Sequence, residues 1–132
     1  MKTAINITRL LCLLLSLQSA TALAQETSRS QLIGSWGGPL VIGEDDQGLV
    51  FNFSLLEGEY AASIISDGLG IYGMPADRVS LNGLSLTVVI SRLDVEFTGT
   101  LRFDEAGETL LRIDANWFQG SEMVPVVLRP VK

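Results

Sequence analysis

The chain has no histidine, and Cys12 is the only cysteine among its 132 residues. The lack of histidine excludes Ser-His triads, Cys-His dyads, ordinary zinc sites and imidazole acid-base catalysis near neutral pH. P-loop and dinucleotide-binding motifs are missing too, because the glycine-rich segment GLGIYG at residues 68–73 lies between expected strands with no helix after it. These absences predict a chain that is not an enzyme and that uses no cofactor and no metal ion.

Long apolar runs are also missing, apart from LLCLLLSL at residues 10–17. This run is too short to span a bilayer, because a spanning helix needs about 20 apolar residues. Lys2 and Arg9 supply positive charge around its start, and the Ala-Leu-Ala sequence at 22–24 is typical of a cleavage site. We therefore predict a signal peptide over residues 1–24 and a periplasmic or secreted protein.

The predicted mature chain, residues 25–132, is one domain with few basic residues. Two of the nine Lys and Arg residues lie in the leader, so seven remain against fifteen acidic residues and the net charge is −8. Such a charge disfavours binding to nucleic acid and to anionic membranes. Cys12 lies inside the apolar run, which argues against a lipid anchor and leaves no disulfide in the mature domain.

Apolar and polar residues alternate along most of the mature chain, and turn-forming residues recur about every ten positions. The alternation is cleanest in the last strands, which is typical of an antiparallel sheet with one wet and one dry face. The polar face there consists of Glu96, Thr98, Thr100, Arg102, Arg112, Asp114 and Asn116. Eight strands are expected near residues 39–43, 48–56, 59–66, 76–82, 84–91, 94–103, 109–118 and 123–129.

Four turns set the expected pairing of these strands. Asn82-Gly83 is a strong two-residue hairpin signal, and Glu57-Gly58 is a similar one. Loops at 104–107 and 119–122 join the last three strands. The expected cross-strand partners are Leu81–Leu84, Val79–Leu86, Phe53–Ala62, Phe51–Ile64, Leu101–Leu111, Gly99–Ile113, Phe97–Ala115, Val95–Trp117, Trp117–Val124 and Ala115–Val126.

A sheet of this size must cover its apolar face, and curling into a barrel does so while removing the exposed edges. We predict an all-β fold, a short eight-stranded antiparallel up-and-down barrel, with a β-sandwich as the alternative. In such a barrel Trp36 and Arg129 lie at the same end. We expect Trp36 to plug this floor and Arg129 to stack on the indole, which requires the alternation to break near Pro130.

Two resemblances bear on function. Gly34-Ser35-Trp36, with Arg129 at the end of the last strand, resembles the pattern of lipocalins and calycins, which implies a ligand-binding barrel. Nearly all of the mature chain, through GSWGGPL, EYAASIISDGLGIYGMPADRVSLNG, FTGTL and VVLRP, also resembles a small β-domain N-terminal to some exported bacterial serine hydrolases of the α/β-hydrolase type. No G-x-S-x-G motif with partners occurs in this sequence and no hydrolase domain follows, so this second resemblance implies an accessory or binding domain without the activity.

Acidic residues offer the remaining catalytic or metal-binding chemistry. Residues 44–46 could hold calcium, but they lack the alternating oxygen ligands of a loop site, so a solvated turn is favoured. Asp67 could be a catalytic carboxylate, but an Asx-type turn is favoured there. Asp77 stands alone at the margin of the apolar face, whereas glycoside hydrolysis needs two facing carboxyl groups. A carboxylate-driven hydrolase is therefore the weakest hypothesis.

The other candidate site is the barrel mouth, beneath a long apolar loop at residues 66–75 that we expect to act as a lid. Gly99 faces inward and would leave room in the middle, so a ligand cavity and a filled barrel are both compatible with the pattern. Tyr72 and Trp117 are the strongest candidates for ligand contact, because each adds a polar group to a flat apolar surface. The expected ligand-binding residues are Phe51, Ile64, Leu69, Ile71, Tyr72, Met74, Ile90, Val95, Phe97, Trp117 and Val124.

Two functions follow from this pattern. The leading hypothesis is a non-catalytic, lipocalin-like exported protein that binds a small apolar or amphipathic ligand in the barrel mouth. The alternative is an accessory module that docks on an exported hydrolase or on another protein partner.

Overall fold

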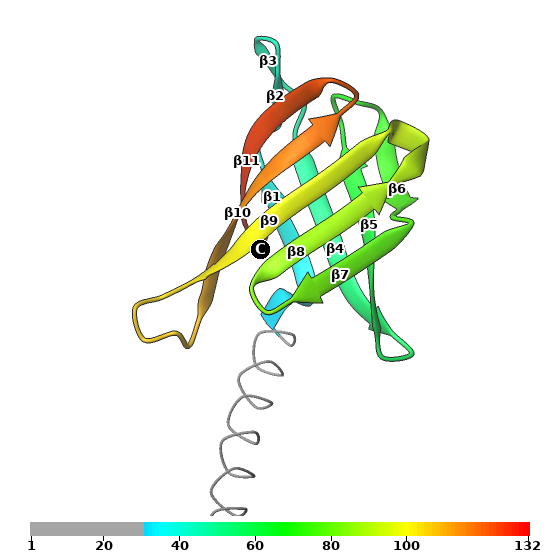
Figure 1. The fold of residues 1–132 in the computed structure, drawn as a ribbon. Coiled ribbons are helices and arrows are strands. Elements are labelled where there is room, and N and C mark those ends of the chain that lie inside the picture. The colour runs from blue at the N-terminus through cyan, green and yellow to red at the C-terminus, as the bar shows by residue number, and fades with distance from the viewer. Residues whose placement is uncertain (1–30) are drawn as a thin grey trace, which may run out of the picture.

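The computed structural model describes residues 31–132, and their regular secondary structure is almost entirely β-strand (Figure 1). The predicted signal peptide and its cleavage site lie outside the described residues. The main strands are β1 (Gly34–Gly38), β4 (Leu49–Leu56), β5 (Glu59–Ser66), β6 (Ile71–Pro75), β7 (Arg78–Asn82), β8 (Ser85–Ile90), β9 (Val95–Phe103), β10 (Leu110–Gln119) and β11 (Glu122–Pro130). A small hairpin of β2 (Val41–Ile42) and β3 (Asp45–Asp46) and the 3-10 turn η1 (Ser91–Leu93) complete the described region.

The main strands form one antiparallel sheet that curls around a single apolar core (Figure 1). Its order is β6-β5-β4-β1-β11-β10-β9-β8-β7, so β1 joins the two halves by pairing with both β4 and β11. The two edges, β6 and β7, are consecutive in the chain and are joined only by Ala76 and Asp77. The predicted all-β, barrel-like fold is therefore confirmed. Within residues 31–132, no helix is long and apolar enough to cross a membrane.

The first strand differs from the prediction, because Gly34–Gly38 enters the main sheet and residues 39–43 do not. Its GSWGG sequence resembles a turn, but the glycines are needed for close packing between two neighbouring strands. A Cβ atom on Gly38 would collide with the carbonyl oxygen of Val127, and one on Gly37 would lie 2.8 Å from Cγ2 of Val131. This change replaces one strand by another and leaves the expected number of strands unaltered.

The segment expected to be a lid loop is also a strand, β6. It pairs with Ser63–Ser66 of β5 through an irregular register, and its sequence IYGMP contains Gly73 at a φ of +95° and Pro75. Glycine and proline are tolerated here because β6 is an edge strand, where they also discourage pairing with other chains.

Two of the four predicted hairpin registers are confirmed and two are wrong. Phe53 pairs with Ala62, and Trp117 pairs with Val124, as predicted. The β7–β8 turn lies at Gly83-Leu84, one residue later than expected, and the β9–β10 pairing is shifted by two residues. The observed partners are Leu81–Leu86, Val79–Val88, Leu101–Ile113, Gly99–Ala115, Phe97–Trp117 and Val95–Gln119.

Both shifts keep the inward face along the paired strands, but Leu84 and Leu111, which were expected to face inward, are 47% and 42% exposed. Both shifts have a tertiary cause. The carbonyl oxygen of Leu84 accepts a hydrogen bond of 2.8 Å from the N–H of Leu101 on β9, which holds Leu84 in the turn. The β9–β10 ladder has a bulge between Leu110 and Arg112, beside the loop that closes this hairpin. Neither the contact nor the bulge is visible in local sequence.

Trp36 is buried in the core, as predicted, and its indole Nε1–H donates a 2.9 Å hydrogen bond to the carbonyl oxygen of Leu32. Leu32 is itself fully buried. The predicted stack of Arg129 on this indole is wrong. Arg129 pairs with Gly37 and is exposed, whereas Pro130 is the residue opposite Trp36. The stack required the alternation of inward and outward side chains to break near Pro130. The alternation continues through Leu128 and Arg129, so Arg129 points outward.

The floor is held by a clasp between the start of the described chain and the β9–β10 loop. The side-chain oxygen of Gln31 accepts a 2.7 Å hydrogen bond from the N–H of Leu110, and its amide nitrogen donates to the carbonyl oxygen of Glu108. The loop itself is ordered by Asp104, whose Oδ1 accepts hydrogen bonds from the N–H groups of Glu108 and Thr109. These backbone donors hold the pKa of Asp104 below its ordinary value of 3.8.

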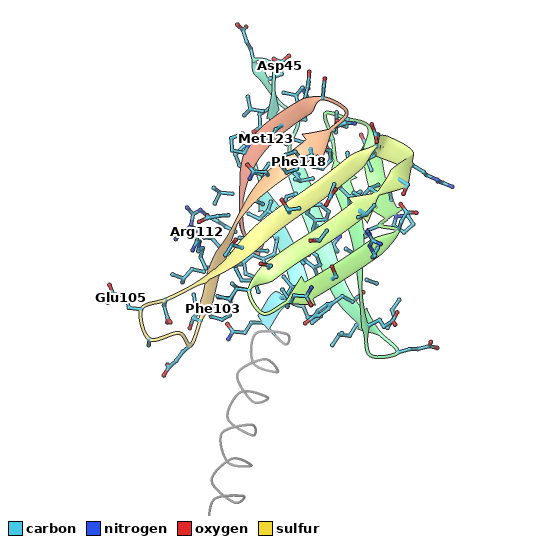
Figure 2. All side chains as sticks on the ribbon, viewed as in Figure 1. Asp45, Phe103, Glu105, Arg112, Phe118 and Met123 are labelled. Atoms are coloured by element: carbon cyan, nitrogen blue, oxygen red, sulfur yellow. The ribbon has the colours of Figure 1, made fainter. Side chains whose placement is uncertain are left out.

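Asp104→Asn is expected to lower the urea midpoint of unfolding at neutral pH and to have little effect well below the ordinary pKa. Because the pKa is lowered in the folded chain, the stabilisation by the charged carboxylate is present above 3.8 and is lost as the pH falls through the folded-state pKa. Urea titrations of both chains over a series of pH values measure the difference. Glu105→Gln, in the same loop (Figure 2), is the control for loss of one charge. A difference between wild type and Asp104→Asn that stays constant with pH would contradict the assignment.

Candidate functional site

The interior of the barrel is filled by the side chains that were predicted to line its mouth. Phe51, Phe97 and Trp117 have exposed fractions of 0%, and the rings of Phe51 and Phe97 are 4.8 Å apart between centroids. Ile64, Ile90 and Val95 are at most 3% exposed. A side chain that a water-sized sphere cannot reach adjoins no space large enough for a ligand, so these six residues form a close-packed core.

The polar group of Trp117 is also satisfied within the protein. Its Nε1–H donates a 3.2 Å hydrogen bond to Oε1 of Gln119, whose amide nitrogen in turn donates to the carbonyl oxygen of Leu93. This chain of hydrogen bonds ties the upper end of β10 to η1. Trp117 is therefore a core residue, and its indole N–H is bonded within the protein and is not directed into a cavity.

The remaining predicted ligand-binding residues are spread over different environments. Ile71 is buried, and Met74 and Val124 are partly buried against the core. Leu69 is 36% exposed, and Tyr72 is 75% exposed on the edge strand β6. The structure therefore does not bring Tyr72 and Trp117 together over one pocket, and the expected lid of residues 66–75 is replaced by a turn at 67–70 followed by β6.

The upper end of the barrel is closed instead by the connection between β1 and β4. Leu40 in this connection is fully buried. The carboxylate of Asp46 accepts hydrogen bonds from the N–H groups of Leu40 at 3.0 Å and Gly48 at 2.8 Å, which folds the connection back on itself. The sequence prediction overlooked Leu40, although the Asp-x-Gly pattern at residue 46 was a signal for such a turn.

Two of the carboxylates that were considered for metal binding or catalysis, those of Asp46 and Asp77, have structural contacts. Asp46 orders the connection just described, and Oδ2 of Asp77 accepts a 2.6 Å hydrogen bond from the N–H of Ser91. Asp67 begins a turn that is closed by a hydrogen bond from the N–H of Gly70 to its carbonyl oxygen. Among residues 31–132, no three His, Cys, Asp or Glu side chains are grouped so that they could hold a metal ion.

The outer face of β9 and β10 carries a small ionic network. Asp114 accepts hydrogen bonds from Nε of Arg112 at 2.9 Å and from Nε of Arg102 at 3.0 Å. The hydrogen bond from Arg112 is the largest cause that holds the pKa of Asp114 below its ordinary value, and together with the bond from Arg102 and the charges of both arginines it outweighs burial, which raises the pKa. Two of the few cations of the chain are thus already paired in the middle of this face.

Above this network, two large apolar side chains lie exposed on the same outer face (Figure 2). Phe118 of β10 and Met123 of β11 are cross-strand partners, and 41% and 56% of their surfaces are exposed. We call this pair the Phe118–Met123 ridge. The sequence prediction missed it, although the confirmed pairing of Trp117 with Val124 already implied that Phe118 and Met123 are neighbours on the opposite face.

A shallow depression lies on each side of the Phe118–Met123 ridge. One, of about 340 Å³, lies toward β8 and η1, and its lining includes Val89, Glu96 and Phe118. The other, of about 420 Å³, lies between β11 and the β2–β3 hairpin, and its lining includes Val41, Met123 and Pro125. An apolar ridge between two hollows can interlock with the side chains of another surface.

Comparison with known proteins gives no functional information, so any functional conclusion has to rest on this geometry. The chain matches no family model, and it is significantly similar to no curated protein and to no solved structure. Its resemblances to lipocalins and to a hydrolase-associated β-domain therefore stay predictions.

Proposed function

We propose that the chain is a non-catalytic, exported protein-interaction module that docks on a partner protein through its outer surface. The observation that carries the proposal is the distribution of apolar side chains. The residues that would line an internal ligand site are packed against one another, whereas Phe118 and Met123 are exposed side by side on the outside. Binding to a second protein gives such a pair an apolar environment, which an empty outer surface does not.

This proposal takes the second of the two functions predicted from the sequence. A lipocalin-like carrier needs an internal space of a few hundred cubic ångströms for its ligand. The fully buried Phe51, Phe97 and Trp117 occupy the region where that space was expected. The depressions that the described residues form are open to solvent, at the outside or at the edges of the sheet.

Native mass spectrometry of the chain purified from its host after mild chemical cross-linking tests the proposal. We expect a complex with one defined protein chain in a fixed ratio, because docking on a partner is the proposed role. An apolar fluorescent dye added to the purified chain should give no saturable uptake with a stoichiometry of one. A bare chain in the mass spectrum, or a small molecule bound in a one-to-one ratio, would contradict the proposal.

A further inference from the structure

We infer that the Phe118–Met123 ridge is the docking surface, and that its occupant is a protein surface with exposed apolar side chains surrounded by Lys and Arg. The inference rests on the proposed function, because it names the surface and the chemistry of the partner for that same role. Two observations carry it: the shape around the ridge and the sign of the charge that encircles it.

The shape argument starts from the strand register. One row of cross-strand partners runs over the outer face from Val89 on β8 through Glu96 and Phe118 to Met123 on β11. The row is apolar at Phe118 and Met123, where the surface rises between the two depressions. A partner that packs apolar side chains against the ridge and places basic side chains in the two depressions, where Asp94, Glu96 and Glu122 lie, would cover the ridge completely, which is the arrangement of binding hot spots.

The charge argument rests on the residues around the ridge. Asp94 and Glu96 line the first depression, and Glu122 lines the second. Glu44 and Asp45 lie on the β2–β3 hairpin, next to Gly43 of the second depression, and Figure 2 shows Asp45 near the tip of this hairpin, above Met123. All five carboxylates are exposed.

Positive charge near the ridge is scarce. Within residues 31–132, the cation that neighbours these carboxylates in the chain is Arg92 of η1. Arg102 and Arg112 share the single carboxylate of Asp114, so that cluster contributes one net positive charge against the five carboxylates of the rim. The ridge therefore has an acidic rim with little compensation. Such a rim attracts a basic surface and speeds its association at low ionic strength.

The same rim argues against two other occupants. A second copy of the chain that docked ridge to ridge would bring two acidic rims together, and like charges facing one another across an interface are unfavourable. An anionic lipid surface would be repelled for the same reason. A basic protein surface with apolar side chains at its centre is the occupant that fits both the ridge and its rim.

The test uses two designed amphipathic peptides, one of leucine and lysine and one of leucine and glutamate, and the complete mature chain. Two-dimensional NMR spectra of the chain are recorded while each peptide is added. We expect the Leu/Lys peptide to shift the resonances of residues on the ridge and in its two depressions, and the Leu/Glu peptide to shift none. Raising the salt from about 0.05 M to about 0.5 M should weaken this binding, because the rim charges become screened.

Two matched double variants separate the ridge from general acidity. Phe118→Ser with Met123→Ser removes the ridge, and we expect it to weaken binding of the Leu/Lys peptide at least about tenfold, as loss of a hot spot does. Leu55→Ser with Leu56→Ser removes two exposed leucines at the β4–β5 hairpin, which also carries the carboxylates of Glu57 and Glu59. This control should bind the peptide as wild type does. All four replaced side chains are exposed, and the dispersion of each NMR spectrum reports directly on folding.

Three outcomes would overturn the inference: no shifts with the Leu/Lys peptide, shifts scattered over the whole acidic surface, or equal weakening by both double variants. Concentration-dependent self-association lost in the Phe118→Ser/Met123→Ser variant would instead identify a second copy as the occupant, and would also overturn it. These failures are distinguishable from failure of the proposed function. A partner chain present in the native mass spectrum, but retained by the ridge variant, means that the module docks through another surface.

Discussion

Trp36→Ala is expected to lower the free energy of unfolding by about 3–5 kcal/mol, as large aromatic truncations in protein cores do. The indole is buried between the sheet and the floor, where its Nε1–H donates to the carbonyl oxygen of Leu32. Removing it leaves a cavity in a close-packed core, and it leaves the Leu32 carbonyl without this donor. The loss is measured as the shift of the urea midpoint at constant slope.

Trp36→Phe is the matched control for that variant. Phenylalanine keeps an aromatic ring in the core but cannot donate to Leu32, so we expect a smaller loss of about 1–3 kcal/mol. The difference between the two variants separates the packing of the ring from the hydrogen bond. An unchanged midpoint in Trp36→Ala would show that the indole does not support the floor of the barrel.

The alternation of apolar and polar residues correctly predicted which side chains form the core. Phe97 and Trp117 point inward, and Arg102 and Asp114 point outward, because the two-residue period of a strand assigns faces without knowledge of the partner strand. From Ile113 to Trp117 the face assignment survived the wrong β9–β10 register, because that register is shifted by two residues and not by one. It failed at Leu111, which is exposed because the bulge turns Leu110 inward instead.

The features that escaped prediction depend on contacts between distant segments. Gly34–Gly38 forms a strand between β4 and β11, which leave no room for a Cβ atom at Gly37 and Gly38, and a local glycine-rich pattern cannot reveal this contact. The bulge at Leu110 lies beside the clasp from Gln31, nearly eighty positions earlier in the chain. Residues 71–75 were expected to form a loop, and they contain Gly73 and Pro75. They form a strand instead, because an edge strand tolerates both residues.

The candidate site was mislocated for a related reason. Alternation identifies an inward face, but the volume left inside a barrel depends on how the strands tilt and on which side chains meet. The predicted site residues at the barrel mouth are therefore mostly core residues, and Phe51 and Phe97 fill the space that a ligand would need. An exposed apolar residue is unremarkable by itself in any sequence, so the Phe118–Met123 ridge became a candidate only when the register placed its members together.

Gly99→Leu distinguishes a filled barrel from a hollow one, and we expect it to lower the free energy of unfolding by about 3 kcal/mol, at the upper end of the cost of overpacking. Gly99 pairs with Ala115 in the middle of the sheet. A Cβ atom on Gly99 would already lie 2.8 Å from Cγ2 of Ile113 and 3.0 Å from Cβ of Ala115, both of which are tighter than ordinary contacts. These neighbours must therefore shift before a Cβ atom fits, and the further carbon atoms of leucine add to the volume that they must accommodate.

A second substitution shows whether crowding is the cause of the loss. Ile113→Ala shortens the side chain that lies closest to the new Cβ atom. The double variant Gly99→Leu/Ile113→Ala should therefore lose less free energy of unfolding than the two single variants lose together. Urea midpoints of the four chains of this cycle give the coupling. If Gly99→Leu left the midpoint unchanged, there would be free space beside Gly99, and an internal ligand site would again be the better explanation of the apolar lining. A clear loss that Ile113→Ala partly restores would mean that the barrel has no room for a ligand at this level, and binding would have to take place on the outer surface.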